Sequence, residues 1–237
     1  MVTAQVRVRQ RSKKPKLHVG DRLDQPTFHA RYEAMPRGVH AQLIGGIVFM
    51  PSPMKKPHGK FNILLSRWLG EYEEATPGTE ALAGATEILG SDSEPESDAC
   101  LLILPEYGGQ TRQNDKGYIE GAPEWIAEIA DTTESFDLRS KKRDYEKAGV
   151  REYVVVALRS KKVHFFRRKR GKLKEAAADS DGIDRSAVFP GLWLDPAALL
   201  RRDSKRLMAV LRLGLASPEL ATFVAELAEK KSAGNDG

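Results

Sequence analysis

The sequence predicts a mixed α/β fold in which a mixed central β-sheet is flanked by helices. The continuous apolar run 99–104 indicates a strand that is covered on both faces, and residues 125–130, which are apolar except for Glu128, indicate a second buried strand. A third segment, 61–72, has apolar residues at helical spacing and indicates an amphipathic helix that packs on the sheet. The 237 residues, of which 41% are hydrophobic, suffice for one such domain with short tails.

The elements before the first central strand are a hairpin and this helix. Apolar residues at 43–44 and 47–50 flank the pair Gly45-Gly46. Because glycine adopts positive φ without strain, this pair suits the two-residue turn of a β-hairpin. The helix is expected to begin near His58, directly after a proline-rich loop.

The second half of the domain continues with a loop, a helix and a hairpin. A polar loop at 105–122 leads into the second central strand. Residues 136–148 are expected to form a helix that ends at Gly149 in the left-handed conformation. A β-rich run at 153–158 and a returning strand at 163–166 then form a hairpin.

The end of the chain differs in character from the domain. Two short amphipathic segments, 207–215 and 220–227, are expected to be packing or dimer helices. We expect the chain to be divided into four segments: a disordered basic arm at 1–20, a single α/β domain at 21–200, C-terminal helices at 201–231 and a disordered tail at 232–237.

The chain has no segment that predicts a membrane or an export signal. No apolar run approaches the ~20 residues of a membrane helix, and the N-terminus lacks the apolar block of a signal peptide. We expect a cytoplasmic protein with no membrane contact. Cys100 is the single cysteine and lies in the run ACLLIL, where a buried, unreactive thiol is expected.

Positive charge is concentrated in two segments, although the net charge is only +5. Residues 1–18 and 159–174 are rich in lysine and arginine and contain no acidic residue. Such clusters attract phosphates, which favours nucleic acid, and DNA in particular, as a partner. The alternative is a solvated arm and a lysine-rich hairpin edge that discourages aggregation. The candidate nucleic-acid-binding residues are Arg159, Lys161, Lys162, Arg167, Arg168, Lys169 and Arg170.

Two carboxylates on the central strands are candidate metal ligands. Asp98 opens one apolar strand and Glu128 lies inside the other, so neighbouring strands would bring them together at one sheet edge. Buried carboxylates are costly unless they are neutralised, and oxygen ligands suit Mg²⁺ or Mn²⁺. The Ile129 carbonyl could add a ligand. Alternatively, Asp98 is only a turn former, and Glu128 forms a salt bridge with Lys141 or Lys142.

A lysine follows these carboxylates on the predicted helix. Asp137, Lys141 and Tyr145 are spaced by four and therefore share one helix face. A lysine beside a divalent cation can orient an attacking water and offset the charge of a phosphorane, which is the chemistry of phosphodiester hydrolysis. His58, at the start of the earlier helix, is expected at the edge of this site, with an inert polar role as the alternative.

The sequence resembles the Uma-type restriction-endonuclease-like family, a branch of the PD-(D/E)XK nuclease superfamily, from about Tyr32 to Leu194. The resembling segments are QLIGGIVFMPSP followed by His58, residues 95–103 around Asp98, APEWIAEI, the spaced set Asp137, Lys141, Tyr145, Gly149-Val150 and Glu152-Tyr153, and FPGLWLD. The resemblance implies a restriction-endonuclease-like core in which Asp98 and Glu128 bind metal. The lysine, displaced from position 130 onto the next helix, would be Lys141.

The sequence departs from the family pattern in ways that bear on activity. The family's usual glutamate in its Glu-Leu-Ile segment is Gln42, its Pro-Asp is Ser97-Asp98, and its Pro-Ser-Pro-Ser-Thr-like stretch is replaced at 131–134. We therefore expect a Mg²⁺-dependent or Mn²⁺-dependent DNA endonuclease. The alternative is a catalytically weakened nucleic-acid-binding module, because Gln42 keeps an oxygen but loses a charge. A structural or oligomeric role would leave Glu128 unexplained, whereas paired cuts would favour a homodimer.

Overall fold

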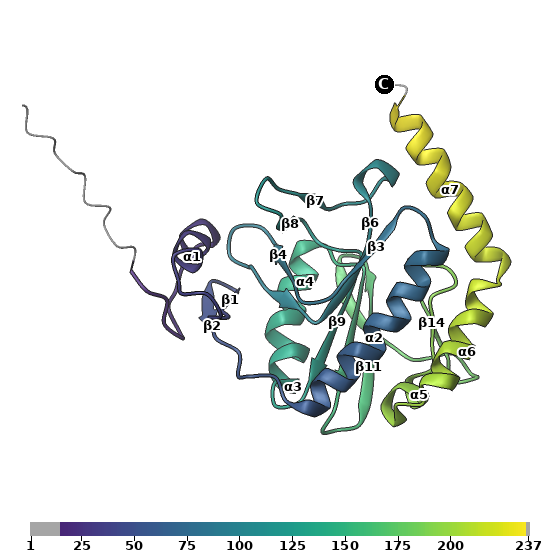
Figure 1. The fold of residues 1–237 in the computed structure, drawn as a ribbon, viewed down its shortest axis with the longest axis horizontal. Helices are drawn as coiled ribbons and strands as arrows, with labels where there is room; N and C mark the ends of the chain where they lie inside the picture. The colour runs from purple at the N-terminus through teal and green to yellow at the C-terminus, as the bar shows by residue number, and fades with distance from the viewer. Residues whose placement is uncertain (1–14, 236–237) are drawn as a thin grey trace, which may run out of the picture.

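A mixed six-stranded sheet forms the centre of the protein (Figure 1) in the computed structural model, which describes residues 15–235. Strands β9 and β10 are parallel, and the other neighbours in this sheet are antiparallel. In spatial order the strands are β12 (Lys172–Ala176), β11 (Lys162–Lys169), β10 (Glu152–Ala157), β9 (Trp125–Ala130), β6 (Ala99–Ile103) and β3 (Thr79–Leu82).

The two apolar runs form neighbouring central strands, as predicted. Every residue of β6, β9 and β10 is buried, because both faces of the sheet are covered. Side chains alternate between the faces along each strand, so Trp125, Ala127 and Ile129 enter one core and Ile126 and Ala130 the other. The fold class predicted from the sequence is confirmed.

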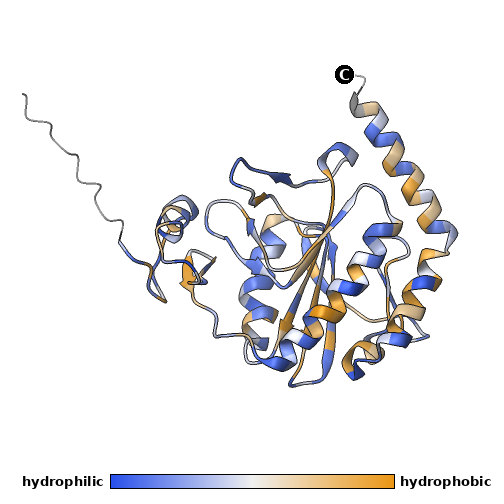
Figure 2. Cartoon of the chain, in the orientation of Figure 1, coloured by the Kyte–Doolittle hydropathy of each residue, from blue (hydrophilic) through white to orange (hydrophobic). Residues whose placement is uncertain are grey.

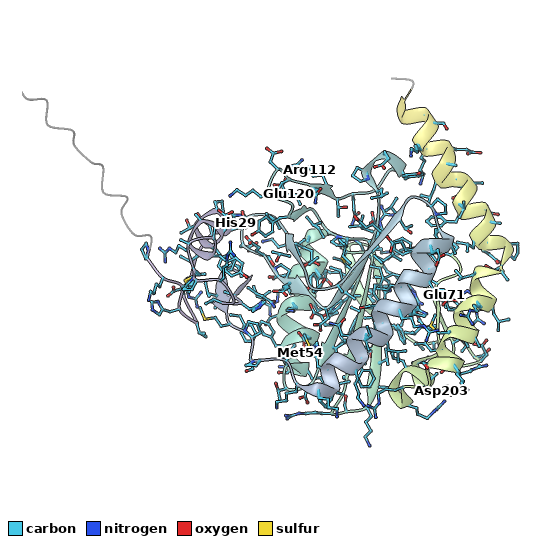
Figure 3. The ribbon with its side chains drawn as sticks, in the orientation of Figure 1. His29, Met54, Glu71, Arg112, Glu120 and Asp203 are labelled. Carbon is cyan, nitrogen blue, oxygen red and sulfur yellow. The ribbon has the colours of Figure 1, made fainter. Side chains whose placement is uncertain are left out.

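Helix α2 (Lys56–Ala75) covers one face of the sheet, and its apolar side faces the strands (Figures 1 and 2). The C-terminal helices pack against it and belong to the same core. Trp68 Nε1 donates to the Trp193 carbonyl at 3.1 Å, and Arg212 pairs with Glu71 at 2.6 Å (Figure 3). These helices are α5 (Pro196–Arg201), α6 (Ser204–Leu215) and α7 (Pro218–Asn235).

The other face carries a helical segment that is not a single regular helix. It consists of α3 (Glu134–Phe136), the π-helical turn η2 (Asp137–Lys141) and α4 (Lys142–Ala148). Gly149 ends it in the left-handed conformation with a φ of 110°, as predicted. The sequence pattern predicted an uninterrupted helix at 136–148, and the π-turn is the difference. Such turns occur often at functional sites.

A smaller unit at the N-terminal side holds helix α1 (Gln25–Tyr32) and the predicted hairpin of β1 (Gln42–Ile44) and β2 (Ile47–Phe49). Gly45 and Gly46 have φ values of 57° and 76°, which a two-residue hairpin turn requires. Phe49 stacks on Phe136 with ring centroids 4.6 Å apart, so the hairpin is placed beside the π-turn.

The remaining strands form two small sheets. One contains β5 (Glu96–Ser97), β4 (Ala85–Ile88), β8 (Ile119–Glu120) and β7 (Arg112–Gln113), in that order. The other pairs β13 (Asp184–Arg185) with β14 (Trp193–Leu194). The loop expected at 105–122 therefore contains β7 and β8, and also the 3₁₀ turn η1 (Pro105–Tyr107).

The expected tails differ from the observed chain where the structure describes them. Leu17 is buried and the Gly20 N–H donates to the Val48 carbonyl, so the last residues of the expected arm pack on β2. Residues 1–14 and 236–237 lie outside the described residues. Helix α7 extends to Asn235, beyond residue 231, where the tail was expected to begin.

No single helix among the described residues has both the length and the hydropathy needed to cross a bilayer. Among these residues, one pair of helices meets the length and hydropathy criteria only when the two are counted together. They are Ser204–Leu215 and Pro218–Ala233, and a bend of 62° separates them.

Two helical glycines provide a test of how tightly the C-terminal helices pack. A Cβ added at Gly214 in α6 would lie 2.2 Å from the Gly191 carbonyl oxygen, whereas one added at Gly70 in α2 would meet nothing within 4 Å. We expect Gly214→Ala to lower the free energy of unfolding by about 1–3 kcal/mol through overpacking. Gly70→Ala should raise it by about 0.5–1 kcal/mol. Urea unfolding measures both, and equal effects would contradict the packing of α6.

Candidate active site

The sheet register brings Asp98 and Glu128 to the same place. Ala99 pairs with Ala127 in the antiparallel ladder of β6 and β9, and extending this register by one residue sets Asp98 opposite Glu128. Residues opposite each other in such a ladder project from the same face. Asp98 Oδ2 accepts a hydrogen bond from the Ile129 N–H at 2.7 Å, which ties it to the strand that carries Glu128.

Glu128 is buried on the π-turn side of the sheet, and the helical segment donates two hydrogen bonds to one of its carboxylate oxygens. The Glu128 side chain is on the same face of the sheet as Ile126 and Ala130, and Glu128 is only 3% exposed. Glu128 Oε1 accepts hydrogen bonds from Lys141 Nζ at 2.8 Å and from the Tyr145 hydroxyl at 2.6 Å. One carboxylate oxygen therefore joins three of the predicted site residues.

Burial and charge act in opposite directions on this pair. Burial raises the pKa of Glu128 well above its usual range, and the ammonium of Lys141 opposes that shift. Burial also acts to lower the pKa of Lys141, but the carboxylates of Glu128 and Asp137 outweigh it, so the pKa of Lys141 is raised. The raised pKa of Lys141 favours its charged form, and the same ammonium reduces the cost of ionising Glu128 in the core.

Asp137 and His58 complete the cluster around Asp98. Asp137 is 3% exposed and accepts a hydrogen bond from the Thr133 hydroxyl at 2.6 Å, and burial raises its pKa. His58 Nε2 is 3.2 Å from Asp98 Oδ2. Burial acts to lower the pKa of His58, but the carboxylates of Asp98, Asp137 and Asp131 together outweigh this effect, and the pKa is raised. His58, which was expected at the edge of the candidate site, therefore contacts Asp98.

The Ile129 peptide borders this cluster, and Gln42 lies on the hairpin that packs beside the π-turn. The Ala130 carbonyl accepts from the Leu158 N–H, so the peptide groups of Ile129 face the opposite side, toward Asp98. Gln42 is 6% exposed, and its Oε1 has no hydrogen-bond partner among the described residues. The stack of Phe49 on Phe136 places the strand pair of Gln42 next to the π-turn.

The donor set suits a small hard cation that keeps part of its water shell. Within the described residues, no three His, Cys, Asp or Glu side chains are arranged to hold a metal ion. Two carboxylates, Asp98 and Glu128, lie opposite each other in the extended register, and a backbone carbonyl faces the same side. Mg²⁺ in proteins is commonly bound by one or two carboxylates and several waters. The residues present fit such an ion.

Glu87 is a buried carboxyl near the site that the sequence analysis missed. It is 0% exposed, accepts a hydrogen bond from the Ser97 hydroxyl, and its Oε2 has no partner among the described residues. Burial raises its pKa to about 8, and Lys141 opposes this shift. The sequence predicted no strand at 85–88, and nothing in this short segment marks Glu87 as a buried residue.

The second basic cluster is divided by the structure. Lys162 and Lys169 lie at opposite ends of β11, about 23 Å apart at the usual rise of a strand. Arg167 is held inside the protein by Glu152 and Asp184, with the shorter contact at 2.7 Å. Five of the candidate nucleic-acid-binding residues are exposed, at the two ends of β11 and in the turns beyond them: Arg159, Lys161, Lys162, Lys169 and Arg170.

The geometry defines an α/β protein of the restriction-endonuclease-like fold class. A solved structure supports this class: the crystal structure of "a putative nuclease belonging to DUF820" from Anabaena variabilis matches with a TM-score of 0.54 and 14% sequence identity. The match covers 72% of this chain and 97% of that one. The Uma2 family model, described as "Putative restriction endonuclease", matches residues 26–197, and the chain belongs to this family. No curated protein matches the chain.

Replacing Lys141 should expose the cost of burying Glu128. We expect Lys141→Met to lower the free energy of unfolding by about 3–5 kcal/mol at about pH 8, because an uncompensated carboxylate stays in the core. Since the folded pKa of Glu128 is raised above its unfolded value, this loss should shrink as the pH falls to about 5 and the carboxyl becomes protonated. Urea unfolding at both pH values measures the difference.

Lys147 on the same helix supplies the control, since it pairs with Asp92 at the surface. Lys147→Met should cost at most about 1 kcal/mol. If Lys141→Met were equally mild at both pH values, Glu128 would not depend on Lys141 for its charge.

Proposed function

We propose that this protein is a divalent-metal-dependent endonuclease that hydrolyses phosphodiester bonds of DNA, with Asp98, Glu128 and Lys141 at its active site. The observation that carries the proposal is the buried ammonium of Lys141, which lies 2.8 Å from Glu128. Glu128 belongs to strand β9, and the same strand holds Asp98 through the Ile129 N–H. Asp137 adds a further buried carboxyl beside this pair, and ionisable groups with shifted pKa values are typical of functional sites. Membership of the Uma2 family supports the same chemistry.

Asp98, Glu128 and the Ile129 carbonyl are the groups that would hold Mg²⁺ or Mn²⁺. The ion, when bound, acts as a Lewis acid on the phosphate. Lys141 then donates hydrogen bonds to the attacking water and to the phosphoryl oxygens, where negative charge develops. Tyr145 fixes the position of Glu128 through its hydroxyl, and His58 holds the carboxylate of Asp98 in place.

A catalytically weakened nucleic-acid-binding module is the second candidate, and Gln42 favours it. The amide oxygen of Gln42 is buried without a partner among the described residues, at the position where the family pattern has a glutamate. An amide binds a divalent cation more weakly than a carboxylate does. In this case the protein would bind DNA through its exposed cations and cut it slowly or not at all.

A cleavage assay with an isosteric variant tests the leading proposal. We expect the purified protein to nick plasmid DNA with Mg²⁺ or Mn²⁺ but not with EDTA, and Glu128→Gln to lose about 100-fold or more of this activity. Glu80→Gln, on the edge strand β3, is the matched control and should cut normally. Linear DNA, single-stranded DNA and RNA are assayed in parallel. Equal cutting by Glu128→Gln would refute the assignment of the site.

Restoring the family's carboxylate tests the second candidate. If Gln42 limits the affinity for metal, Gln42→Glu should lower the Mg²⁺ concentration at half-maximal cleavage by about tenfold or more. The measurement is a Mg²⁺ titration of plasmid cleavage, with protein unfolding followed in parallel. An unchanged midpoint would mean that position 42 does not act on the metal.

A further inference from the structure

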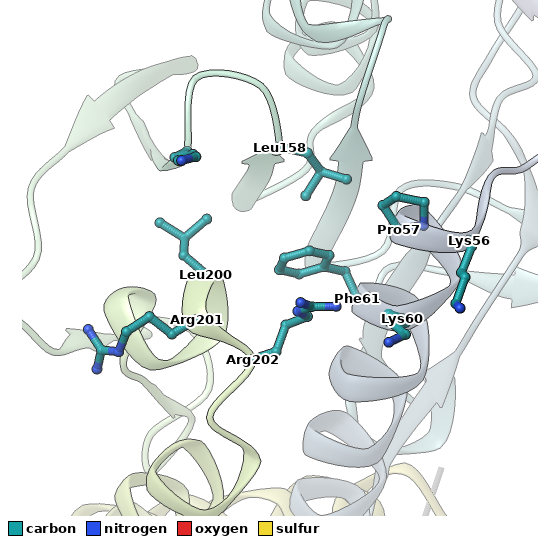
Figure 4. Close-up of a pocket in the computed structure, with 9 residues that line it drawn as sticks. Lys56, Pro57, Lys60, Phe61, Leu158, Leu200, Arg201 and Arg202 are labelled. Carbon is teal, nitrogen blue, oxygen red and sulfur yellow. The ribbon is translucent and has the colours of Figure 1, made fainter.

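A cationic cavity of about 560 Å³ lies between the start of α2, the turn that joins β10 to β11, and the end of α5 (Figure 4). None of its lining residues is acidic. Five are basic and three are apolar, and proline is the ninth. They are Lys56, Pro57, Lys60, Phe61, Leu158, Lys161, Leu200, Arg201 and Arg202.

The basic side chains of this cavity are not used by the fold. All five are exposed, and within the described residues none is part of an ion pair. Arg201 lies in the last turn of α5, where a cation complements the helix dipole, and it extends away from Phe61 (Figure 4). Arg202 extends toward Phe61, across from Lys60 (Figure 4). The cavity is therefore lined by basic side chains that have no ion-pair partner among the described residues, together with three apolar side chains.

The cavity is connected to the candidate active site by one peptide bond and one backbone hydrogen bond. Pro57 lines the cavity, and the next residue, His58, contacts Asp98. Leu158 also lines it, and its N–H donates to the carbonyl of Ala130 at 2.8 Å, two residues after Glu128. A strand whose phosphate occupies the active site could place a neighbouring nucleotide here.

Two of the cations stand at backbone positions that favour glycine. Lys161 and Arg202 have φ values of 53° and 58°, in the left-handed region. A non-glycine residue costs about 1 kcal/mol or more there. Each turn keeps a basic residue despite this cost, and a change to glycine removes the side chain without straining the fold.

We propose that this cavity binds one nucleotide of a single-stranded segment of nucleic acid next to the phosphodiester bond that is cut. The phosphate lies among Lys60, Lys161 and Arg202, and the unpaired base lies on the floor formed by Phe61, Leu158 and Leu200. An apolar floor inside a cavity can contact a base that has left the duplex stack, whereas paired bases present only their edges. The proposal rests on the proposed function, since the bound strand is taken to be the substrate.

Binding in the absence of catalysis tests this assignment. A labelled oligothymidine of about ten nucleotides is titrated with the protein in EDTA, and fluorescence anisotropy is followed at several salt concentrations. We expect Lys161→Gly with Arg202→Gly to weaken binding by about tenfold or more and to reduce the slope of log K against log salt by about 0.7, the value for one lost phosphate contact on a single strand. Thermal unfolding of this variant should occur no lower than that of the wild type.

The matched control is Arg67→Ala with Lys230→Ala, which removes the same charge from exposed positions outside the cavity. It should bind nearly as the wild type does. An equal loss in both double variants would mean diffuse electrostatics and would overturn the proposal, as would wild-type affinity in the glycine variant or no binding by the wild type.

A second comparison separates the base from the phosphate. An abasic oligomer of the same charge should bind the wild type about tenfold more weakly than oligothymidine does. Equal affinity of the two, or a preference for duplex DNA, would overturn the single-strand assignment. Normal binding without any cleavage would refute the proposed function alone, whereas normal cleavage with an unaffected glycine variant would refute only the cavity.

Discussion

The buried contact between Lys141 and Glu128 is the constraint on which the candidate site depends. Moving either charge from water into the core is expensive, and the partner at 2.8 Å offsets much of that cost. The pair links a strand of the central sheet to the helical segment that covers it, and Tyr145 contacts the same oxygen. Stability and candidate chemistry therefore depend on the same atoms, so this part of the core cannot be replaced by apolar residues without losing the site.

The fold could be predicted from the sequence where local patterns are unambiguous. The runs around Cys100 and Ala127 have no polar interruption other than Glu128, so their burial follows from hydrophobicity alone. The turn at Gly45-Gly46 could be predicted because glycine adopts positive φ without strain. The small sheet that includes β4 was not predicted, because its strands are short and a buried acid, Glu87, replaces the expected apolar residue.

The candidate site could be predicted only in part, for a related reason. The joint order of Asp98, Glu128 and Lys141 indicated a site, and the register and hydrogen bonds place the three side chains around two adjacent strands. Sequence spacing does not report where exposed cations meet in space. Lys60 and Arg202 are separated by most of the domain in sequence and still line one cavity. Arg167, by contrast, appeared free in the sequence and is held by two acids.

The π-turn η2 also determines the phase of the helix relative to the sheet. In a regular α-helix, residues spaced by four advance about 40° per interval, so Asp137 and Tyr145 would diverge by about 80°. A π-turn closes with a bond from residue i to i+5, and this wider turn takes up part of that divergence. The alignment thus depends on the number of residues between Asp137 and Lys141. Deletion of one residue between Asp137 and Lys141 would keep every candidate catalytic residue in the sequence. It would nevertheless rotate the side chains on either side of the deletion relative to each other, so that they no longer face the same part of the sheet.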